Sequence, residues 1–451
     1  MTGTDAGARA QLPSRAALLA PWVGGLVIVL LGILVGLSPP WLIYDERAYM
    51  EGPYVLASGA GFRELMTTRL DITAGPLYAY IHYIASPVTG LTPPSMRYVN
   101  VALLVVLLWT LASTIEKLGY DHARSRAAMM LAVPMIGSTT GLALTEVPAL
   151  ALVGVACACV ASCHGRQSRA YDLACYAIAG VCAGLAILGR QTYLPGLVGF
   201  VLIAAAVPRY RLACLLAIAI AGLIVAPLVV LWGGLTPPWQ PNVASGINLQ
   251  HGILAFVYLA VVAVLIAPGF VIEAYARPRL RLVGMAAIPA TFLVAWLLEL
   301  RFDVAQRVVN IFPASTEPLI QLAATSAMLA IAGLFGIAAA HHLWDRRADK
   351  RFLLLMGMTV LLNGTAVGIA HQFSSRYVLV SFPFALLALQ PWIRANQWAA
   401  ARIILGASLG MASLAAYYWN EPPLDPTLRS VAPPEIIQAM PPWTDPSQPH
   451  E

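Results

Sequence analysis

The sequence has 451 residues, of which only 11% are charged and 59% are hydrophobic. A soluble protein of this length carries about a quarter charged residues, and the mean hydropathy here is +0.74. These values exclude a water-soluble protein and predict one that is embedded in a membrane. The formal net charge is +6, but no basic cluster accompanies a soluble domain. A nucleic-acid partner is therefore not expected.

Apolar runs recur along the chain. The first, at about 17–37, is long enough to cross a bilayer and lacks a small-residue cleavage site, so we expect an uncleaved helix rather than a signal peptide. Similar runs lie at about 97–115, 127–144, 147–163, 173–189, 195–207, 212–232, 253–272, 282–298, 318–340, 352–370, 377–391 and 401–419. The expected fold is an all-α polytopic membrane protein with about 13 transmembrane helices (11–13). Residues 1–419 are expected to form one transmembrane domain, and 420–451 a Pro-rich tail.

Lys and Arg residues are concentrated in every second connection between these runs. The positive-inside rule then predicts a cytoplasmic N-terminus in the cell inner or plasma membrane, with the tail on the outer face. The basic residues left on the outer side are Arg47, Arg63, Arg69, Arg97, Arg190, Arg301, Arg307, Arg376 and Arg429.

The first outer connection, 38–96, is much longer than most others and holds several acidic and aromatic residues. Two of its stretches, 45–57 and 76–85, have helical character and are expected to lie along the membrane surface. Asp45 and Glu46 are adjacent carboxylates just outside the hydrocarbon region, where one can act as a base while the other orients or holds charge. The alternative is an acidic pair at a helix N-terminus, favoured by the macrodipole. The other polar positions of this connection include Tyr49, Glu51, Glu64, Asp71 and Tyr78.

Two further segments have unusual polar or small residues. Asp71 begins a stretch in which Thr73, Ala74 and Gly75 allow a ligand or another helix to approach the backbone; the alternative is an ordinary loop-to-helix turn. Glu146 lies between two apolar runs, where a carboxylate is costly unless it faces protein or a water-filled cavity. It is expected either to function in a site or to be a structural partner of an Arg.

Arg190 and Arg376 lie at outer ends of spans and contradict the positive-inside trend, so each needs a local anion. An Arg fork matches a phosphate or carboxylate bidentately. Together with His371 and Arg97 at the same level, they favour a phosphate site. The alternatives are pairing with Glu146 or Asp45, or contact with lipid headgroups.

Other catalytic patterns are missing from the sequence. There is no Walker A, GxSxG, HExxH or GxGxxG arrangement, which removes support for ATP-driven transport, serine hydrolysis and zinc proteolysis. The six cysteines form no CxxC pair, so they are expected to be packing residues.

These features resemble the GT-C glycosyltransferases, which use polyprenyl-phosphate sugars. The local likeness is to the dolichyl-phosphate-glucose α-1,2-glucosyltransferase group, and the later segment 375–379 is similar to the lipid A aminoarabinose and mannosyl transferase branches. The segments that carry the first likeness are 44–46, 71–78, 97–100 and 190–192.

The resemblance implies transfer of a sugar, with inversion, from a polyprenyl-phosphate donor to a hydroxyl of a glycan, lipid or protein acceptor at the outer face. Asp45 would be the general base, with Glu46 as its substitute. The donor phosphate would be bound by Arg376, Arg190, His371 and Arg97, and the sugar or acceptor by Glu146, Asp71, Gln191, Tyr377 and Tyr49. Some relatives place a divalent metal ion near the first-loop acid, but no ligand spacing here demands one.

A multi-pass transporter or flippase of lipid-linked or amphipathic substrates is the main alternative, because it would also explain many spans and intramembrane polar residues. The charges here gather at outer span ends and in one long outer connection, which favours interfacial chemistry. An O-antigen-ligase-like enzyme would have its large outer loop late in the chain, and a purely structural membrane protein is a further alternative.

Overall fold

The computed structural model describes residues 15–68, 74–163, 168–240, 246–297, 302, 315–369 and 373–420. Within these ranges the chain forms α-helices and 3-10 helices and no strand. The predicted all-α fold is confirmed. The tail 421–451, Asp71 and His371 lie outside the described residues.

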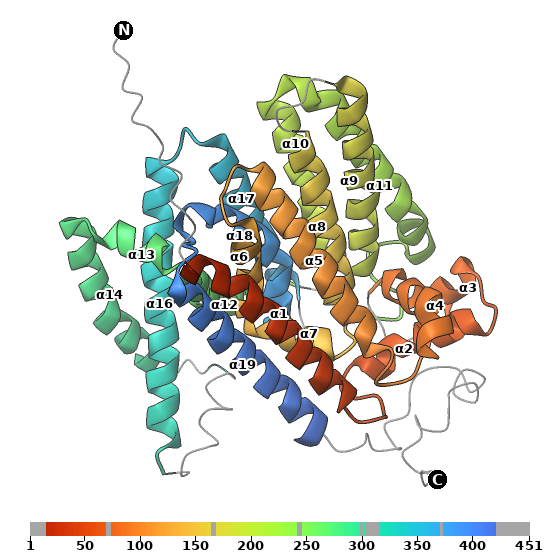
Figure 1. Ribbon diagram of the computed structural model, residues 1–451, viewed down its shortest axis with the longest axis horizontal. Helices are drawn as coiled ribbons and strands as arrows, with labels where there is room; N and C mark the ends of the chain where they lie inside the picture. The colour runs from red at the N-terminus through yellow and green to blue at the C-terminus, as the bar shows by residue number, and fades with distance from the viewer. Residues whose placement is uncertain are drawn as a thin grey trace.

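Ten long helices of the described chain form the body of the bundle (Figure 1). They are α1 (Arg15–Gly36), α5 (Arg97–Lys117), α8 (Glu146–Ser162), α9 (Arg169–Gly189), α11 (Arg211–Trp232), α12 (Leu249–Ile266), α14 (Pro278–Leu297), α16 (Glu317–Asp345), α17 (Lys350–Gly364) and α19 (Gln397–Asn420). The shorter α-helices are α2 (Glu46–Ala57), α3 (Phe62–Thr67), α4 (Leu77–Thr89), α6 (Ala123–Ala128), α7 (Pro134–Gly141), α10 (Leu197–Ala206), α13 (Pro268–Tyr275) and α18 (Phe382–Ala388). The 3-10 segments are η1 (Met129–Ala132), η2 (Gln191–Gly196), η3 (Pro208–Tyr210), η5 (Thr365–Gly368), η6 (Ser375–Ser381) and η7 (Gln390–Trp392).

Nine helices of the described chain are long and apolar enough to cross a membrane, or ten if the pair α7 and α8, bent by 117°, is one span. The predicted count of about 13 is not confirmed. The runs predicted at 127–144, 195–207 and 377–391 are broken into short helices that contain or begin near Pro134, Pro195 and Pro383. Proline removes a backbone donor and interrupts a helix. The helix α10, with 10 residues, is only about 15 Å long.

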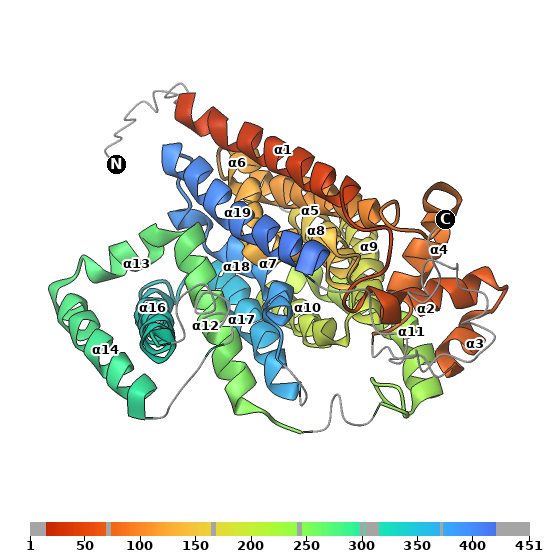
Figure 2. The same cartoon turned by 90° about the horizontal axis from the view of Figure 1, so that it is seen from below.

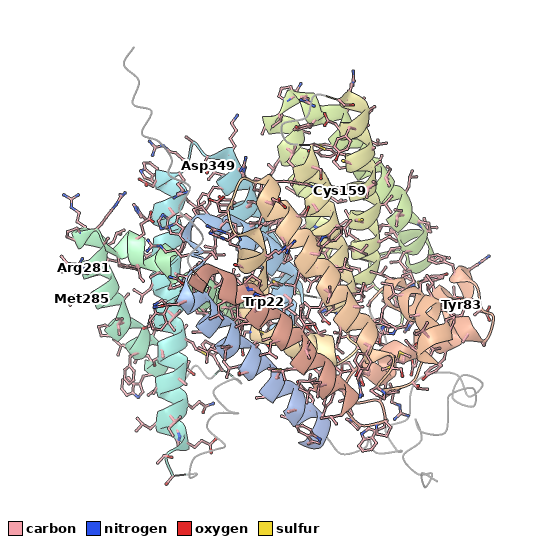
Figure 3. All side chains as sticks on the ribbon, viewed as in Figure 1. Trp22, Tyr83, Cys159, Arg281, Met285 and Asp349 are labelled. Atoms are coloured by element: carbon pink, nitrogen blue, oxygen red, sulfur yellow. The ribbon has the colours of Figure 1, made fainter. Side chains whose placement is uncertain are left out.

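The outer surface of the bundle is apolar. Trp22 on α1 and Met285 on α14 are 79% and 65% exposed (Figure 3), and exposed Leu, Val, Ile and Trp side chains are found on most of the long helices. Water would not tolerate so much contiguous apolar surface, whereas lipid does. The surface therefore agrees with an integral membrane protein.

The basic connections gather at one end of the bundle. Arg402, near the start of α19, donates to the carbonyl of Ile266 at the end of α12 at 2.7 Å. Arg351, at the start of α17, donates to the carbonyl of Leu118 just after α5 at 3.2 Å. These bonds join helix ends that are far apart in sequence. The opposite end of the bundle carries the segment between α1 and α5, which is seen beside α9 and α11 (Figures 1 and 2).

This segment contains α2, α3 and α4. The helices predicted at 45–57 and 76–85 are confirmed as α2 and α4, and α3 is additional. A Cβ atom at Gly75 would overlap the carbonyl oxygen of Leu188 near the end of α9. The expectation that a small residue here admits close approach of another helix is therefore confirmed, and α4 is held against the site end of α9.

The last helix, α19, packs closely on η1 and α7 through glycines. A Cβ atom at Gly406 would overlap the carbonyl oxygen of Ala132, and one at Gly410 would overlap the carbonyl oxygen of Pro134. Both of these carbonyl oxygens belong to the backbone, which cannot move aside as a flexible side chain can. The two glycines therefore fix how closely α19 approaches the α7 region.

We expect Gly406→Ala to destabilise the protein by about 1–3 kcal/mol, because the added methyl group must push two helices apart. Gly222→Ala is the matched control: it lies inside α11 with nothing within 4 Å of an added Cβ, so its stability should be unchanged or slightly higher. Thermal unfolding of both variants in detergent measures the difference. Equal stability of the two variants would show that α19 is not closely packed against η1 at Gly406.

Candidate active site

Four charged side chains meet where several helix ends converge. Asp45 precedes the first residue of α2, Glu146 begins α8, Arg190 directly follows α9, and Arg376 lies in η6. Because α8 and α9 are consecutive and pack against each other, the start of one lies beside the end of the other. A carboxylate at a helix N-terminus and a cation at a helix C-terminus are each favoured by the helix dipole.

The four groups form a continuous chain of ion pairs. Arg190 Nη2 lies 2.6 Å from Glu146 Oε1, and Arg376 Nε lies 3.5 Å from the same oxygen. Arg376 Nη2 donates to Asp45 Oδ2 at 2.5 Å. The pairing that the sequence left open as an alternative, Arg with Glu146 or Asp45, is thus present.

These groups differ in how accessible they are. The side chains of Glu146 and Arg376 are 1% and 10% exposed, whereas that of Asp45 is 36% exposed. Asp45 is therefore the carboxylate of the cluster that a substrate reaches most easily. Its partner Arg376 lies behind it, shielded from solvent.

Several polar atoms of the buried groups lack a hydrogen-bond partner within the described part of the chain. They are Nε and Nη1 of Arg376, Nε of Arg190 and Oε2 of Glu146. Buried polar atoms are normally paired, and leaving a charged group unpaired is costly. Guanidinium N–H groups in this position are suited to an additional anion.

Both guanidinium groups lie over aromatic rings. The Tyr377 ring centroid lies 5.6 Å from Arg376 Cζ and 5.5 Å from Arg190 Cζ, so one ring serves two cations. The Tyr44 ring lies 5.3 Å from Arg376 Cζ. Such cation–π contacts favour the charged form of each Arg.

Tyr44 and Tyr49 complete the surroundings of Asp45. Tyr44 has φ 52°, a left-handed conformation that is uncommon for a non-glycine residue and is often found at functional sites. Burial raises the pKa of Tyr49 even though Arg376 and Arg190 act in the opposite direction, so its phenol stays protonated at neutral pH. Tyr44 was not among the predicted site residues; its only sequence signal is its position directly before Asp45.

Glu46 is not available for catalysis. Its side chain is fully buried, and its two oxygens accept bonds from Arg97 Nε at 2.8 Å and Nη2 at 2.6 Å. The backbone N–H groups of Ile43 and Ala143 donate to it at 3.0 and 2.9 Å. The prediction of Glu46 as a second catalytic carboxylate does not fit these contacts, because each oxygen is already engaged by protein donors.

Arg97 is also engaged within the protein. Besides its two bonds to Glu46, it donates through Nη1 to Ser38 Oγ at 2.6 Å and to the Pro39 carbonyl at 2.8 Å, and through Nη2 to the Trp41 carbonyl at 2.8 Å. All five N–H donors of the guanidinium are accounted for. The predicted role of Arg97 in binding a phosphate is corrected to a structural one.

The remaining predicted residues lie in or beside the cluster where they are described. Gln191 follows Arg190 at the start of η2, Tyr377 stacks on both Arg side chains, and Tyr49 is buried beside them. Asp71 and His371 are outside the described residues, so their roles stay predictions.

A resident divalent metal ion does not fit the described residues. In the part of the chain that the structure describes, no group of three or more His, Cys, Asp or Glu side chains is arranged to hold one, and the Asp45 carboxylate faces the Arg376 guanidinium. A cation placed at Asp45 would be repelled by that guanidinium. No step proposed below uses a metal.

No protein-family model and no curated protein matches this sequence. Among solved structures, the fold is similar to that of ArnT from Cupriavidus metallidurans in the apo state, with 17% identity over 90% of this chain and 78% of that chain and a TM-score of 0.44. ArnT bound to undecaprenyl phosphate gives 17% identity over 89% and 77%, with a TM-score of 0.44. The oligosaccharyltransferase of Archaeoglobus fulgidus in the apo form gives 13% identity over 88% of this chain and 55% of that chain, with a TM-score of 0.40. Likeness at this level concerns the course of the helices and carries no conclusion about activity.

We expect Arg97→Gln to destabilise the protein by about 3–5 kcal/mol, because it leaves the buried Glu46 carboxylate without its partner. Arg277→Gln is the control, since Arg277 pairs with Asp345 in an exposed position at 3.3 Å and such a pair contributes at most about 1 kcal/mol. Thermal unfolding in detergent and the yield of monodisperse protein measure both. If Arg97→Gln is as stable as Arg277→Gln, the structural role of Arg97 is wrong.

Proposed function

We propose that this protein is a glycosyltransferase that transfers a sugar from a polyprenyl-phosphate donor to an acceptor hydroxyl. The observation that carries the proposal is the pair of buried guanidinium groups, Arg376 and Arg190, with N–H groups that have no acceptor within the described chain. A donor phosphate is an anion of the right geometry for these groups. The accessible carboxylate of Asp45, next to Arg376, is in position to serve as a base.

The proposed reaction is a single displacement. Asp45 accepts the proton of the acceptor hydroxyl as its oxygen bonds to the anomeric carbon, while the bond from that carbon to the phosphate oxygen breaks. The attack comes from the face opposite the leaving group, so the anomeric configuration inverts. The bonding electrons leave with the phosphate, and Arg376 and Arg190 stabilise the added negative charge.

Other side chains of the cluster are suited to hold the sugar or the acceptor. Glu146 Oε2 has no hydrogen-bond partner in the described structure and is an acceptor for a sugar hydroxyl. Tyr49, Gln191 and Tyr377 lie in or beside the same cluster. We propose that these residues orient the substrates, with Asp71 as a further candidate for this role and His371 as a further candidate phosphate ligand.

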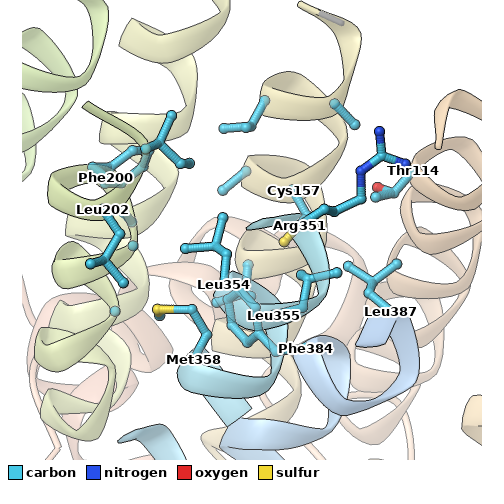
Figure 4. A pocket seen from close by; sticks show the side chains of 18 of the residues that line it. Thr114, Cys157, Phe200, Leu202, Arg351, Leu354, Leu355, Met358, Phe384 and Leu387 are labelled. Atoms are coloured by element: carbon cyan, nitrogen blue, oxygen red, sulfur yellow. The ribbon is translucent and has the colours of Figure 1, made fainter. Parts of the chain in front are cut away.

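A cavity of about 740 Å³ supports a lipid-linked donor. It is bounded near the site by Tyr193, whose N–H donates to the Arg190 carbonyl at 3.0 Å, and its far end is lined by Lys350 and Arg351. Between these ends the lining is mainly apolar and includes Phe200 and Met358 (Figure 4). An isoprenoid tail placed there would bury apolar surface while its phosphate stays at the guanidinium groups.

We also propose how the chain is oriented. The basic connections would lie in the cytoplasm, together with the N-terminus, and the Asp45 cluster would lie on the outer face of the inner or plasma membrane. Residues 1–419 would form one transmembrane domain, and the tail 420–451 would lie on the outer side. The gathering of basic helix ends opposite the Asp45 cluster supports this orientation.

We expect Asp45→Asn to lower the rate of sugar transfer by about 10²–10⁴-fold, because a general base contributes about that much. The assay incubates the protein in lipid nanodiscs with a panel of polyprenyl-phosphate sugars and a membrane extract that supplies acceptors. Release of polyprenyl phosphate and appearance of glycosylated product are followed by mass spectrometry.

Asp172→Asn is the matched control, because Asp172 also pairs with an Arg, Arg209 at 2.7 Å, but at the opposite end of α9. It should transfer sugar at the wild-type rate. Full activity of Asp45→Asn would remove Asp45 as the base. A wild-type protein that moves lipid-linked sugar between leaflets but never cleaves it would instead be a transporter or flippase.

We expect Arg376→Ala to raise the KM for the donor by about 10- to 100-fold, because a charged hydrogen-bonding partner of the phosphate is lost. Arg376→Lys should recover only part of the effect, since an ammonium group lacks the planar fork. Steady-state kinetics with varied donor concentration measures both, and Arg209→Ala is the control. An unchanged donor KM in Arg376→Ala would contradict the assignment of Arg376 to the phosphate.

A further inference from the structure

Arg376 contacts the base that the reaction needs. Its Nη2 donates to Asp45 Oδ2 at 2.5 Å. This is an oxygen that would accept the proton from an incoming hydroxyl. The same guanidinium carries Nη1 and Nε, which are buried without a hydrogen-bond partner in the described chain. Arg376 therefore holds Asp45 through Nη2, its Nε faces Glu146 Oε1 at 3.5 Å, and its Nη1 has no partner in the described chain.

The Arg376 guanidinium also lies over two tyrosine rings. Tyr44 and Tyr377 lie with their ring centroids 5.3 and 5.6 Å from Arg376 Cζ, and Tyr44 in turn packs against Tyr417 of α19, with ring centroids 5.1 Å apart. A cation–π contact is an attraction between the positive charge and the ring face and does not require one particular N–H donor. The group can therefore change hydrogen-bond partners while its position is kept by Tyr44 and Tyr377.

Asp45 and a donor phosphate would compete for this one cation. The described neighbours of Arg376 that carry negative charge are Asp45 and Glu146, and Glu146 is bonded more closely to Arg190, at 2.6 Å against 3.5 Å to Arg376. Asp45 is also the more exposed of the two carboxylates. Asp45 is therefore the partner that an arriving phosphate displaces most easily.

We propose that Arg376 exchanges partners when the donor binds: it holds Asp45 in the free protein and turns its N–H groups to the donor phosphate in the complex, which releases Asp45 to act as the base. This inference rests on the proposed function and adds an order of events to it. Without a donor, Oδ2 of Asp45 is bonded to Arg376 and is therefore less available to accept a proton from a hydroxyl. When the donor binds, Asp45 becomes free to act as the base at the same time as Arg376 binds the phosphate that will leave.

The exchange makes an unusual prediction for a variant that has no base. Asp45→Asn should bind polyprenyl phosphate more tightly than the wild type, by about tenfold, because the phosphate no longer competes with a carboxylate for Arg376. Binding of undecaprenyl phosphate to the full chain in nanodiscs, by microscale thermophoresis or native mass spectrometry, measures this. Asp172→Asn should bind as the wild type does.

A double-mutant cycle separates exchange from simple charge repulsion. If Asp45 weakens binding only by repelling the phosphate, the gain from Asp45→Asn persists when Arg376 is replaced by Ala. If Asp45 competes for Arg376, the gain falls below about twofold in that background. Arg376→Gln is a second background, because it keeps a polar side chain while removing the charge, and it replaces Arg376→Ala if that variant does not fold.

Each outcome of this experiment has a separate meaning. Wild-type protein that binds no undecaprenyl phosphate at all contradicts the proposed function itself. Binding that Asp45→Asn leaves unchanged or weakens overturns the exchange but leaves the proposed function standing. A gain that remains in the Arg376 variants overturns the exchange in favour of repulsion. A gain that is lost with Arg376 supports the exchange.

Discussion

The buried pair of Glu46 and Arg97 determines where the rest of the site lies. It connects the end of α1, the start of α2, the start of α5 and, through the N–H of Ala143, the turn between α7 and α8. Two ions buried together are stable only when their remaining hydrogen-bonding capacity is satisfied. Here the backbone of two separate segments, 39–43 and 143, satisfies it together with the Ser38 hydroxyl. Asp45 directly precedes Glu46, so the same pair fixes its backbone, and its partly exposed side chain contacts the buried Arg376.

The site itself is assembled from helix ends rather than from helix faces. Glu146 begins α8 and Arg190 follows α9, so both stand at positions that the helix dipole favours. A charged side chain at membrane depth is costly in free energy, so Glu146 and Arg190 are stable there only because they form an ion pair. The same reasoning explains why the described charged cluster lies at the end of the bundle opposite the basic connections.

The sequence was informative about which residues deviate from the membrane pattern and less so about how they pair. Arg190, Arg376 and Glu146 were predicted because charge at those positions needs a partner, and the structure brings them together. The contrast between Asp45 and Glu46 was not predictable, because adjacent carboxylates look alike until a distant Arg97 engages one of them. The predicted count of about 13 spans is not confirmed in the described residues, because runs that contain Pro134, Pro195 and Pro383 are broken there into short helices.

The balance of charge in the cluster argues for a site that changes on binding. Two guanidinium groups and two carboxylates are neutral overall, which lowers the cost of burying them in the free protein. A phosphate adds negative charge to the cluster. The cluster therefore binds it best when one carboxylate moves away from its Arg and leaves that guanidinium to pair with the phosphate. Glu146 is almost completely buried and cannot turn to solvent, whereas Asp45 is partly exposed and can. In the proposed exchange, the difference in exposure between these two carboxylates therefore selects Asp45 as the one that is released, which is also the carboxylate more accessible from solvent.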